Sequence, residues 1–210
     1  RFKMPFISNG TTILNNGAFE ASLGNLVFLS EQTGTNTSSI NFSNPFSSTY
    51  LIYYFQIIYL RSVNGQNVRV NFSTDSGSSW TTKTTAPFSL QTAEPGGEAP
   101  GTRGPQYSSG YDQANSTGDA ILGTINKGGL DTGSDSRFSG DLYLFEPTST
   151  TYHKQFMGRG NSYAEYPGST DCYYNGYVHD SSAINYVRFL SYAGTGTNID
   201  GHIKLYGIKG

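Results

Sequence analysis

The chain has 210 residues, of which only 13% are charged, and its formal net charge is −2. Proteins that bind a nucleic acid backbone gather Lys and Arg on one face, and the absence of any such cluster argues against a nucleic acid partner. The longest apolar run, residues 50–60, is too short for a membrane-spanning helix and contains Gln56, so we expect no membrane insertion. The single cysteine, Cys172, excludes an intrachain disulfide and any cysteine-based zinc site.

The composition favours β-structure throughout. Gly (26 residues), Tyr (16) and Phe (13) are abundant; aromatic residues suit strands, while small polar residues suit turns. Apolar residues recur at spacing two, and Gly, Pro or Asn interrupts almost every segment that could form a helix. We therefore predict an all-β fold, an antiparallel β-sandwich or jelly roll of about ten to twelve strands with essentially no helix. Residues 1–210 are expected to form a single domain.

The first third of the sequence predicts an extended arm over residues 1–20 and strands over 26–30 and 38–42. Residues 50–60 follow as a strand that is apolar on both faces. Such a strand is covered on both sides. The second sheet of the sandwich covers one face, and either loops of the same chain or another subunit covers the other. The candidate residues for a subunit contact are Tyr50, Ile52, Tyr54 and Ile58.

The next segments predict a hairpin and a long insertion. Asn64-Gly65 is a strong hairpin signal and joins the apolar strand to a half-buried strand at residues 68–73. A polar turn then leads to Trp80. Residues 91–136 form a Gly/Pro/Ser/Asp-rich loop insertion, with a weak strand at 121–125. Loops of this length tend to carry function or contacts.

Regular structure resumes with a second hairpin, formed by strands at residues 137–145 and 151–157, and Gly158-Arg-Gly160 predicts a turn. A tyrosine-rich stretch leads to a strand at 183–191. The closing strand begins after an Asn/Asp/Gly turn, and we expect it to be paired inside a sheet. Its alternation places three side chains on one face (Ile203, Leu205, Gly207) and two on the other (Lys204, Tyr206).

No pattern in the sequence indicates catalysis. The carboxylates are scattered and form no recognisable glycosidase pair, and no Gly-x-Ser-x-Gly elbow occurs with a matching acid and histidine. His153, His179 and His202 lack metal-ligand spacing. Residues 131–136 could bring two carboxylates near a cation but lack the other ligands of a calcium loop. We expect no enzyme activity, no catalytic residue, no cofactor and no bound metal.

Five tyrosines form the one cluster that could bind a ligand. Flat aromatic faces flanked by Asn and Asp suit a sugar-binding surface. Packing in the core or in a subunit interface is the alternative interpretation. The candidate glycan-binding or interface aromatics are Tyr163, Tyr166, Tyr173, Tyr174 and Tyr177.

Several segments together resemble a family of virion structural proteins of tailed phages, common among aquatic and marine phages. The closing segment reads Asn198-Ile-Asp-Gly-His-Ile-Lys-Leu-Tyr-Gly-Ile208. A tyrosine-rich strand followed by a Ser-x-Asp-x-Gly turn fits the same pattern, whereas the loop at 93–105 does not match it. The resembling segments are residues 5–19, 49–55, 71–79, 139–156, 181–189 and 198–208.

The resemblance implies a structural component of a phage particle and carries over no catalytic residues. It points to a capsid decoration or cement protein, or the knob of a tail fibre, at the virion surface. Its expected partners are further copies of the chain, with a homotrimer favoured by analogy, and other virion proteins such as the major capsid or tail proteins. The alternative is a lectin-like module that binds a host surface glycan through the tyrosines of residues 163–177.

Overall fold

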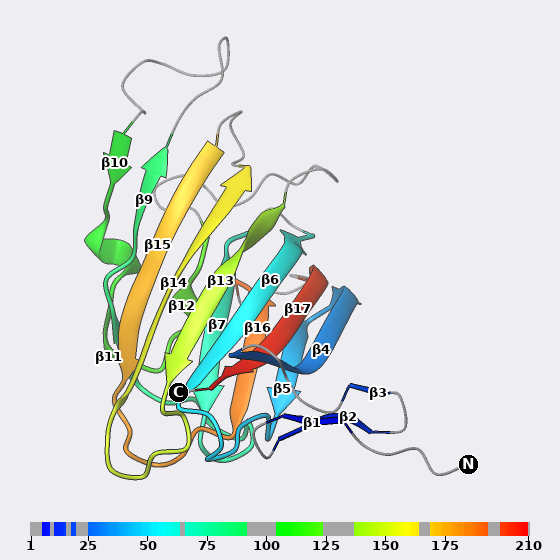
Figure 1. Cartoon of the computed structure of the whole chain (residues 1–210). Helices are drawn as coiled ribbons and strands as arrows, with labels where there is room; N and C mark the ends of the chain where they lie inside the picture. The colour runs from blue at the N-terminus through cyan, green and yellow to red at the C-terminus, as the bar shows by residue number, and fades with distance from the viewer. Residues whose placement is uncertain are drawn as a thin grey trace.

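The computed structural model describes residues 6–8, 11–15, 18–19, 25–63, 66–91, 104–123, 137–163, 169–192 and 198–209 (Figure 1). This part of the chain contains no α-helix and one short 3-10 turn, η2 (Ser109–Tyr111). Every strand pairing in it is antiparallel. The predicted all-β sandwich is confirmed.

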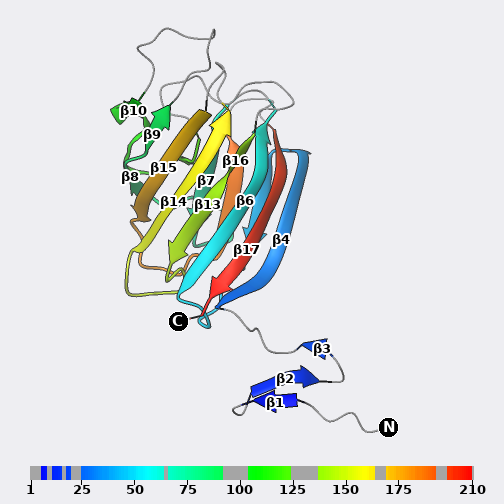
Figure 2. The same ribbon diagram turned by 45° about the horizontal axis from the view of Figure 1, so that its top comes forward.

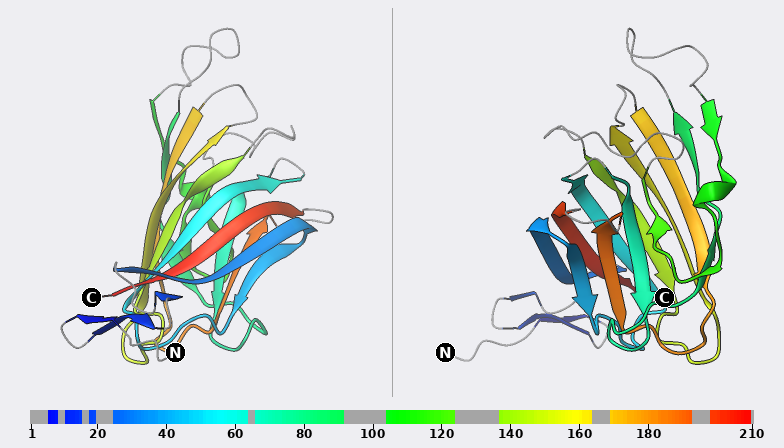
Figure 3. Two further views of the ribbon diagram at one scale, coloured as in Figure 1. Left: turned by 45° about the vertical axis from the view of Figure 1, so that its right-hand side comes forward. Right: turned by 180° about the vertical axis from the view of Figure 1, so that it is seen from behind.

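A large sheet and a small sheet form the sandwich, and a separate N-terminal sheet has three short strands. The large sheet faces the viewer in Figure 1 with the small sheet behind it, and Figure 3 (right) shows the small sheet from the other side. The large sheet has the strand order β10 (Gly104–Gln106), β9 (Phe88–Gln91), β15 (Ser169–Val178), β14 (Lys154–Tyr163), β13 (Phe138–Phe145), β6 (Ile52–Ser62), β17 (Ile199–Ile208) and β4 (Leu26–Thr37), with β8 (Lys83–Thr85) on β15 and β11 (Gln113–Ser116) on β8. The small sheet has the order β12 (Ala120–Ile121), β7 (Val68–Ser73), β16 (Tyr186–Ser191) and β5 (Ser39–Ser43), and the N-terminal sheet contains β1 (Phe6–Ser8), β2 (Thr11–Asn15) and β3 (Ala18–Phe19).

The core lies between the large sheet and the small sheet and is rich in phenylalanine. Phe42 of the small sheet meets Phe55 of the large sheet at 5.3 Å between ring centroids, and Phe189 meets Phe55 at 5.4 Å. Further along, Phe72 and Phe156 lie 5.1 Å apart across the same gap. All five rings are at most 2% exposed. Offset or edge-on aromatic pairs of this kind add to the stabilisation from apolar burial.

The closing strand is paired on both sides. β17 lies between β4 and β6, as Figure 2 shows. Ile203 and Leu205 are fully buried, whereas Lys204 and Tyr206 are partly exposed on the other face. The predicted pairing and alternation of this strand are confirmed.

The strand order corrects the predicted first hairpin. β6 pairs with β13 and β17, whereas β7 pairs with β12 and β16 in the other sheet. The predicted pairing of these two consecutive strands is therefore wrong, although Asn64-Gly65 itself lies outside the described residues. Alternation shows which side chains face a core, but both sheets face the same core, so it does not assign a strand to a sheet.

The second predicted hairpin is confirmed, but the predicted end of its second strand is wrong. β13 pairs with β14 as expected, yet β14 continues through Gly158 and Gly160, where a turn was predicted. A Cβ atom on Gly158 would overlap the Asp141 carbonyl and the Tyr174 ring. These glycines allow close approach of neighbouring groups within a strand.

The turn after β7 is organised by one carboxylate. Asp75 accepts hydrogen bonds from the Ser79 backbone N–H (2.8 Å), the Ser79 hydroxyl (2.5 Å) and the Ser73 hydroxyl (2.7 Å). The Ser73 oxygen in turn accepts from the backbone N–H groups of Asp75 and Gly77. Gly77 has φ +89°, which glycine adopts without strain. The turn fixes the direction in which the chain leaves β7, and Trp80 follows directly after it.

Candidate functional site

One row of side chains crosses the outer face of the large sheet. The pairings Phe28–Tyr206, Tyr206–Tyr54, Tyr54–Tyr143 and Tyr143–Met157 place residues of β4, β17, β6, β13 and β14 directly opposite one another. Successive ring centroids are 5.7, 5.8 and 5.0 Å apart from Phe28 to Tyr143. We call Phe28, Tyr206, Tyr54, Tyr143 and Met157 the outer row.

The outer row is only partly covered by the described residues. Its two ends are the most accessible, with Phe28 56% and Met157 54% exposed, while the three tyrosines between them are half-buried by one another. Burial raises the pKa of Tyr54 and of Tyr143, so both phenols are neutral at physiological pH. A contiguous surface of this kind typically marks an interaction site.

Apolar and charged residues border the outer row on opposite sides. Two residues along, at the ends of these strands, Leu26 pairs with Ile208, and Ile208 pairs with Ile52. In the other direction, Lys204 pairs with both Glu31 and Gln56. The surface therefore combines an apolar strip with charges of both signs.

A groove opens beside the outer row, where β6 and β14 begin and β13 ends. Its volume is about 430 Å³. Tyr152 is 64% exposed at this groove, and His153 and Gln155 are also exposed. The groove, which we call the Tyr152 groove, is lined by Leu51, Ile52, Phe145, Glu146, Tyr152, His153 and Gln155.

The Tyr152 groove continues into a second hollow over β14 and β15. This hollow has a volume of about 510 Å³, and Phe145 and Gln155 line both spaces. Met157, Asn175 and Tyr177 form its far part. Together the two spaces offer aromatic faces beside the side-chain amides of Gln155 and Asn175.

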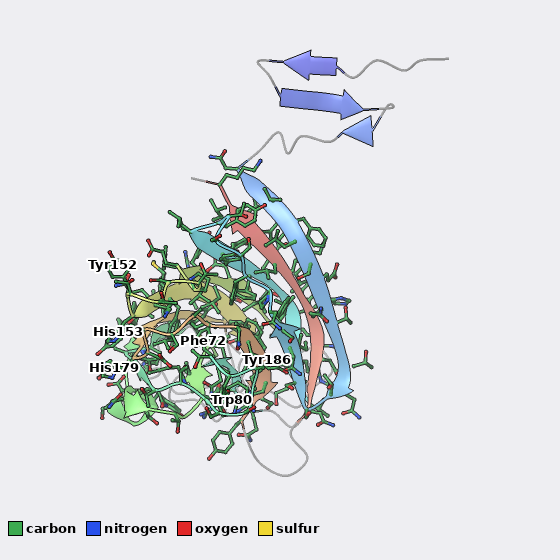
Figure 4. All side chains as sticks on the ribbon, turned by 90° about the horizontal axis from the view of Figure 1, so that it is seen from below. Phe72, Trp80, Tyr152, His153, His179 and Tyr186 are labelled. Carbon is green, nitrogen blue, oxygen red and sulfur yellow. The ribbon has the colours of Figure 1, made fainter. Side chains whose placement is uncertain are left out.

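Two histidines that are far apart in the sequence meet at the edge of this region. The His153 and His179 ring centroids are 4.7 Å apart, with the planes nearly perpendicular at 81°. Tyr177 lies parallel to His153 at 6.1 Å, and His179 Nδ1 lies 2.9 Å from Asn115 Oδ1. Figure 4 shows Tyr152, His153 and His179 together on one side of the molecule, apart from Trp80 and Tyr186. The sequence spacing of the histidines did not predict this meeting.

The groove wall contains an unusual backbone conformation. Glu146 has φ +45°, which is uncommon for a residue with a side chain. Its N–H donates to the Leu51 carbonyl at 2.6 Å, and its carbonyl accepts from Ser149 at 2.9 Å. These two bonds hold the β13–β14 turn at the groove.

The tyrosines predicted as one binding cluster are separated by the pleat of β15. Tyr174 is 2% exposed and belongs to the core, where its hydroxyl donates to the Asp141 carbonyl, so its expected role as a ligand-binding aromatic is corrected. Tyr173 is on the other face, covered by a parallel stack with Phe88 (4.8 Å) and by the Arg159 guanidinium. Tyr177, 37% exposed, is available to a ligand. Tyr166 and the Tyr163 side chain lie outside the described residues.

The predicted subunit-contact strand is also divided between two faces. Ile52, Tyr54 and Ile58 lie half-buried on the outer face of β6, whereas Tyr50 packs against Tyr53 at the margin of the core. Tyr50 is therefore corrected to a core-margin residue. Full coverage of both faces of this strand was predicted, but its outer face is only partly covered by described residues. Phe28, Tyr143, Met157 and Tyr152 were missed, although the alternation of apolar residues in β4 and β13 could have indicated the first two.

The described residues contain no group of three or more His, Cys, Asp or Glu side chains that could hold a metal ion. The possible calcium ligands at 131–136 lie outside these residues. No helix in the described part of the chain is long and apolar enough to cross a membrane. A scan against protein-family models, a search of curated proteins and a search of solved structures each found no match to this chain.

Proposed function

We propose that this chain is a non-enzymatic structural protein of a phage particle, a capsid decoration protein or fibre knob, that associates with further copies of itself through the outer face of its large sheet. The observation that carries this proposal is the outer row, with its exposed ends at Phe28 and Met157. Exposed apolar side chains that continue across several strands lower their free energy by burial against a partner.

The charges around the outer row support a second copy as the partner. Lys204 lies opposite Glu31, and Arg159 forms a bidentate pair with Asp171 on the same face. Because charges of both signs are interspersed, a second copy meets no single-sign repulsion there. The protein's small net charge of −2 also permits self-association.

The proposal predicts an oligomer that the outer row controls. Sedimentation velocity across a concentration series should give a mass that is a multiple of the chain mass. Phe28→Glu and Met157→Glu should each shift the protein to the monomer, because each places an unpaired charge in the interface. Tyr192→Glu is the matched control, because Tyr192 is 47% exposed and packs against Arg69 of the small sheet, away from the outer face of the large sheet; it should not change the mass. A wild-type monomer at every concentration would count against the proposal.

A second candidate function, binding of a host surface glycan, is favoured by the Tyr152 groove. Sugar rings stack on aromatic faces, and their hydroxyls accept hydrogen bonds from amide N–H groups and donate them to carboxylates. This groove places Tyr152 beside Glu146 and Gln155. A glycan array should show ligands for the wild-type protein, and Tyr152→Ala and Tyr177→Ala should abolish that binding. Tyr59→Ala, at a 64% exposed tyrosine outside the groove, should not. A blank array would remove this candidate.

A further inference from the structure

A buried lysine connects the two sheets. Lys83 of β8, in the large sheet, and Asn71 of β7, in the small sheet, are both 0% exposed. The Lys83 Nζ donates to Asn71 Oδ1 at 2.5 Å and to the Thr81 carbonyl at 2.9 Å. Because a carbonyl carbon lies only ~1.23 Å from its oxygen, the amine nitrogen is within ~3.7 Å of Asn71 Cγ.

The Asn71 amide is held in one orientation by its other hydrogen bonds. Its Oδ1 also accepts from the Phe72 backbone N–H at 2.9 Å. Its Nδ2 donates to Asp119 Oδ1 at 2.6 Å and to the Thr117 carbonyl at 3.2 Å. The carbonyl oxygen therefore faces the lysine and a backbone donor, while the nitrogen faces a carboxylate.

The surroundings increase the neutral fraction of the lysine, although the charged form still predominates at pH 7. Burial lowers the pKa of Lys83 to about 8, and the nearby Arg188 adds to this effect, while Asp119 opposes it. With that pKa, about a tenth of the molecules carry a free amine at pH 7. A neutral amine is the nucleophilic form of lysine.

We propose that Lys83 and Asn71 condense spontaneously into an isopeptide bond, with Asp119 as the catalytic residue that transfers the proton. The neutral Nζ attacks Cγ of Asn71, and the Phe72 N–H stabilises the negative charge that develops on Oδ1. Asp119 takes a proton from the attacking nitrogen and delivers it to Nδ2. The Cγ–Nδ2 bond then breaks and ammonia leaves. One N–C bond forms and one breaks, and no oxidant or reductant is required.

The attack needs one change of geometry. The hydrogen bond places Nζ near the carbonyl oxygen, whereas attack requires Nζ to face the carbon. The rotatable stem of lysine allows this shift. The new bond joins β8 of the large sheet to β7 of the small sheet, so a covalent link holds the two layers together.

A second buried lysine provides an internal comparison. Lys154 is also 0% exposed, but its Nζ donates to the backbone carbonyls of Asp180 (3.2 Å) and Ser182 (2.5 Å). Backbone amides are poor acceptors for this reaction because the peptide chain would have to break. Burial is common to both lysines, and only Lys83 faces a side-chain amide that a carboxylate also contacts.

Mass spectrometry of the denatured full chain tests the inference. Loss of ammonia lowers the mass by about 17 Da, and we expect this loss in the wild-type protein after incubation at pH 8. Lys83 is the only Lys or Arg between Arg69 and Arg103. Trypsin should therefore release residues 70–103 as one peptide that is about 17 Da below its calculated mass. It should not be cut after Lys83. In tandem mass spectrometry, no backbone fragments should come from residues 71–83, because the link closes them into a ring.

Three variants complete the test. Lys83→Arg and Asp119→Asn should show the full mass calculated from their sequences, whereas Lys154→Arg should retain the loss. Peptide mapping also separates the link from loss of ammonia at Asn64-Gly65, which lies in another tryptic peptide. A wild-type chain of full mass that is cleaved after Lys83 overturns the inference, whether or not the variants fold. So does a loss that persists in Lys83→Arg.

Discussion

Arg188 places its guanidinium carbon 3.6 Å from the centroid of the Trp80 ring on the outer side of the small sheet. The same guanidinium pairs with Asp119 at 3.0 Å, and the two side chains are 25% and 10% exposed. Tyr186 lies 6.1 Å from Trp80 between ring centroids. The only tryptophan of the chain therefore reports on the polar network that reaches Lys83.

Arg188→Ala should destabilise the fold by about 2 kcal/mol, because it removes a cation–π contact and leaves Asp119 partly buried without its partner. The emission of Trp80 should also shift to longer wavelength. Urea unfolding followed by tryptophan fluorescence and by circular dichroism measures both effects. Arg159→Ala, which removes a 61% exposed side chain from its pair with Asp171, is the matched control and should cost much less. Equal losses in the two variants would contradict the assigned role of Arg188.

Gly158→Ala should be strongly destabilising, by about 3 kcal/mol or more, because the added Cβ overlaps the Asp141 carbonyl and the Tyr174 ring. Neither neighbour is free to move, since one is backbone and the other is a buried ring. Gly110→Ala is the control: its Cβ would lie 3.6 Å from the Ser108 hydroxyl, an ordinary contact. Thermal unfolding compares the two, and a small effect at Gly158 would mean that β13 and β14 can separate.

Acid should weaken the turn after β7. Hydrogen bonds from Ser79 and Ser73 lower the pKa of Asp75 to about 2, below the unfolded value of about 3.9. Because the folded-state value is the lower one, the stabilisation is fully present above about pH 4 and is lost as the pH falls toward 2.

Melting temperatures between pH 6 and pH 2 test this expectation. Asp75→Asn should lower the melting temperature at pH 6 and flatten its fall in acid. Ser79→Ala removes one of the donors and should give an intermediate result. An unchanged acid profile in Asp75→Asn would assign the acid sensitivity to other carboxylates. Asp171 is the first alternative, since Arg159 lowers its pKa in the same direction.

Cys172 should be unreactive in the folded protein. Its side chain is 1% exposed, and burial raises the pKa of its thiol to about 12, with a further contribution from Asp171. Iodoacetamide at pH 8 should modify it only after denaturation, as measured by intact mass. A thiol introduced at the exposed Ser48 (Ser48→Cys) serves as the control and should react with iodoacetamide without denaturant. Fast modification of Cys172 without denaturant would show that β15 opens readily.

Local pattern predicted several parts of this fold. The alternation in β17 was correct because side chains of a strand point to opposite faces in turn, whatever the neighbours are. The hairpin of β13 and β14 was also predicted, since a short turn joins strands that pair with each other. Gly158 misled the prediction, because a glycine marks either a turn or a close approach, and only the position of Tyr174 distinguishes them.

The candidate sites needed the tertiary structure for a physical reason. The outer row draws one residue from each of five strands, and their alignment depends on strand order and register, which long-range hydrogen bonds set. For the same reason His153 meets His179, and Lys83 meets Asn71 across the two sheets. The sequence alone determined an all-β chain with an alternating, doubly paired closing strand, because composition and period are local properties. Only packing decided which tyrosines are buried and which lie on the surface.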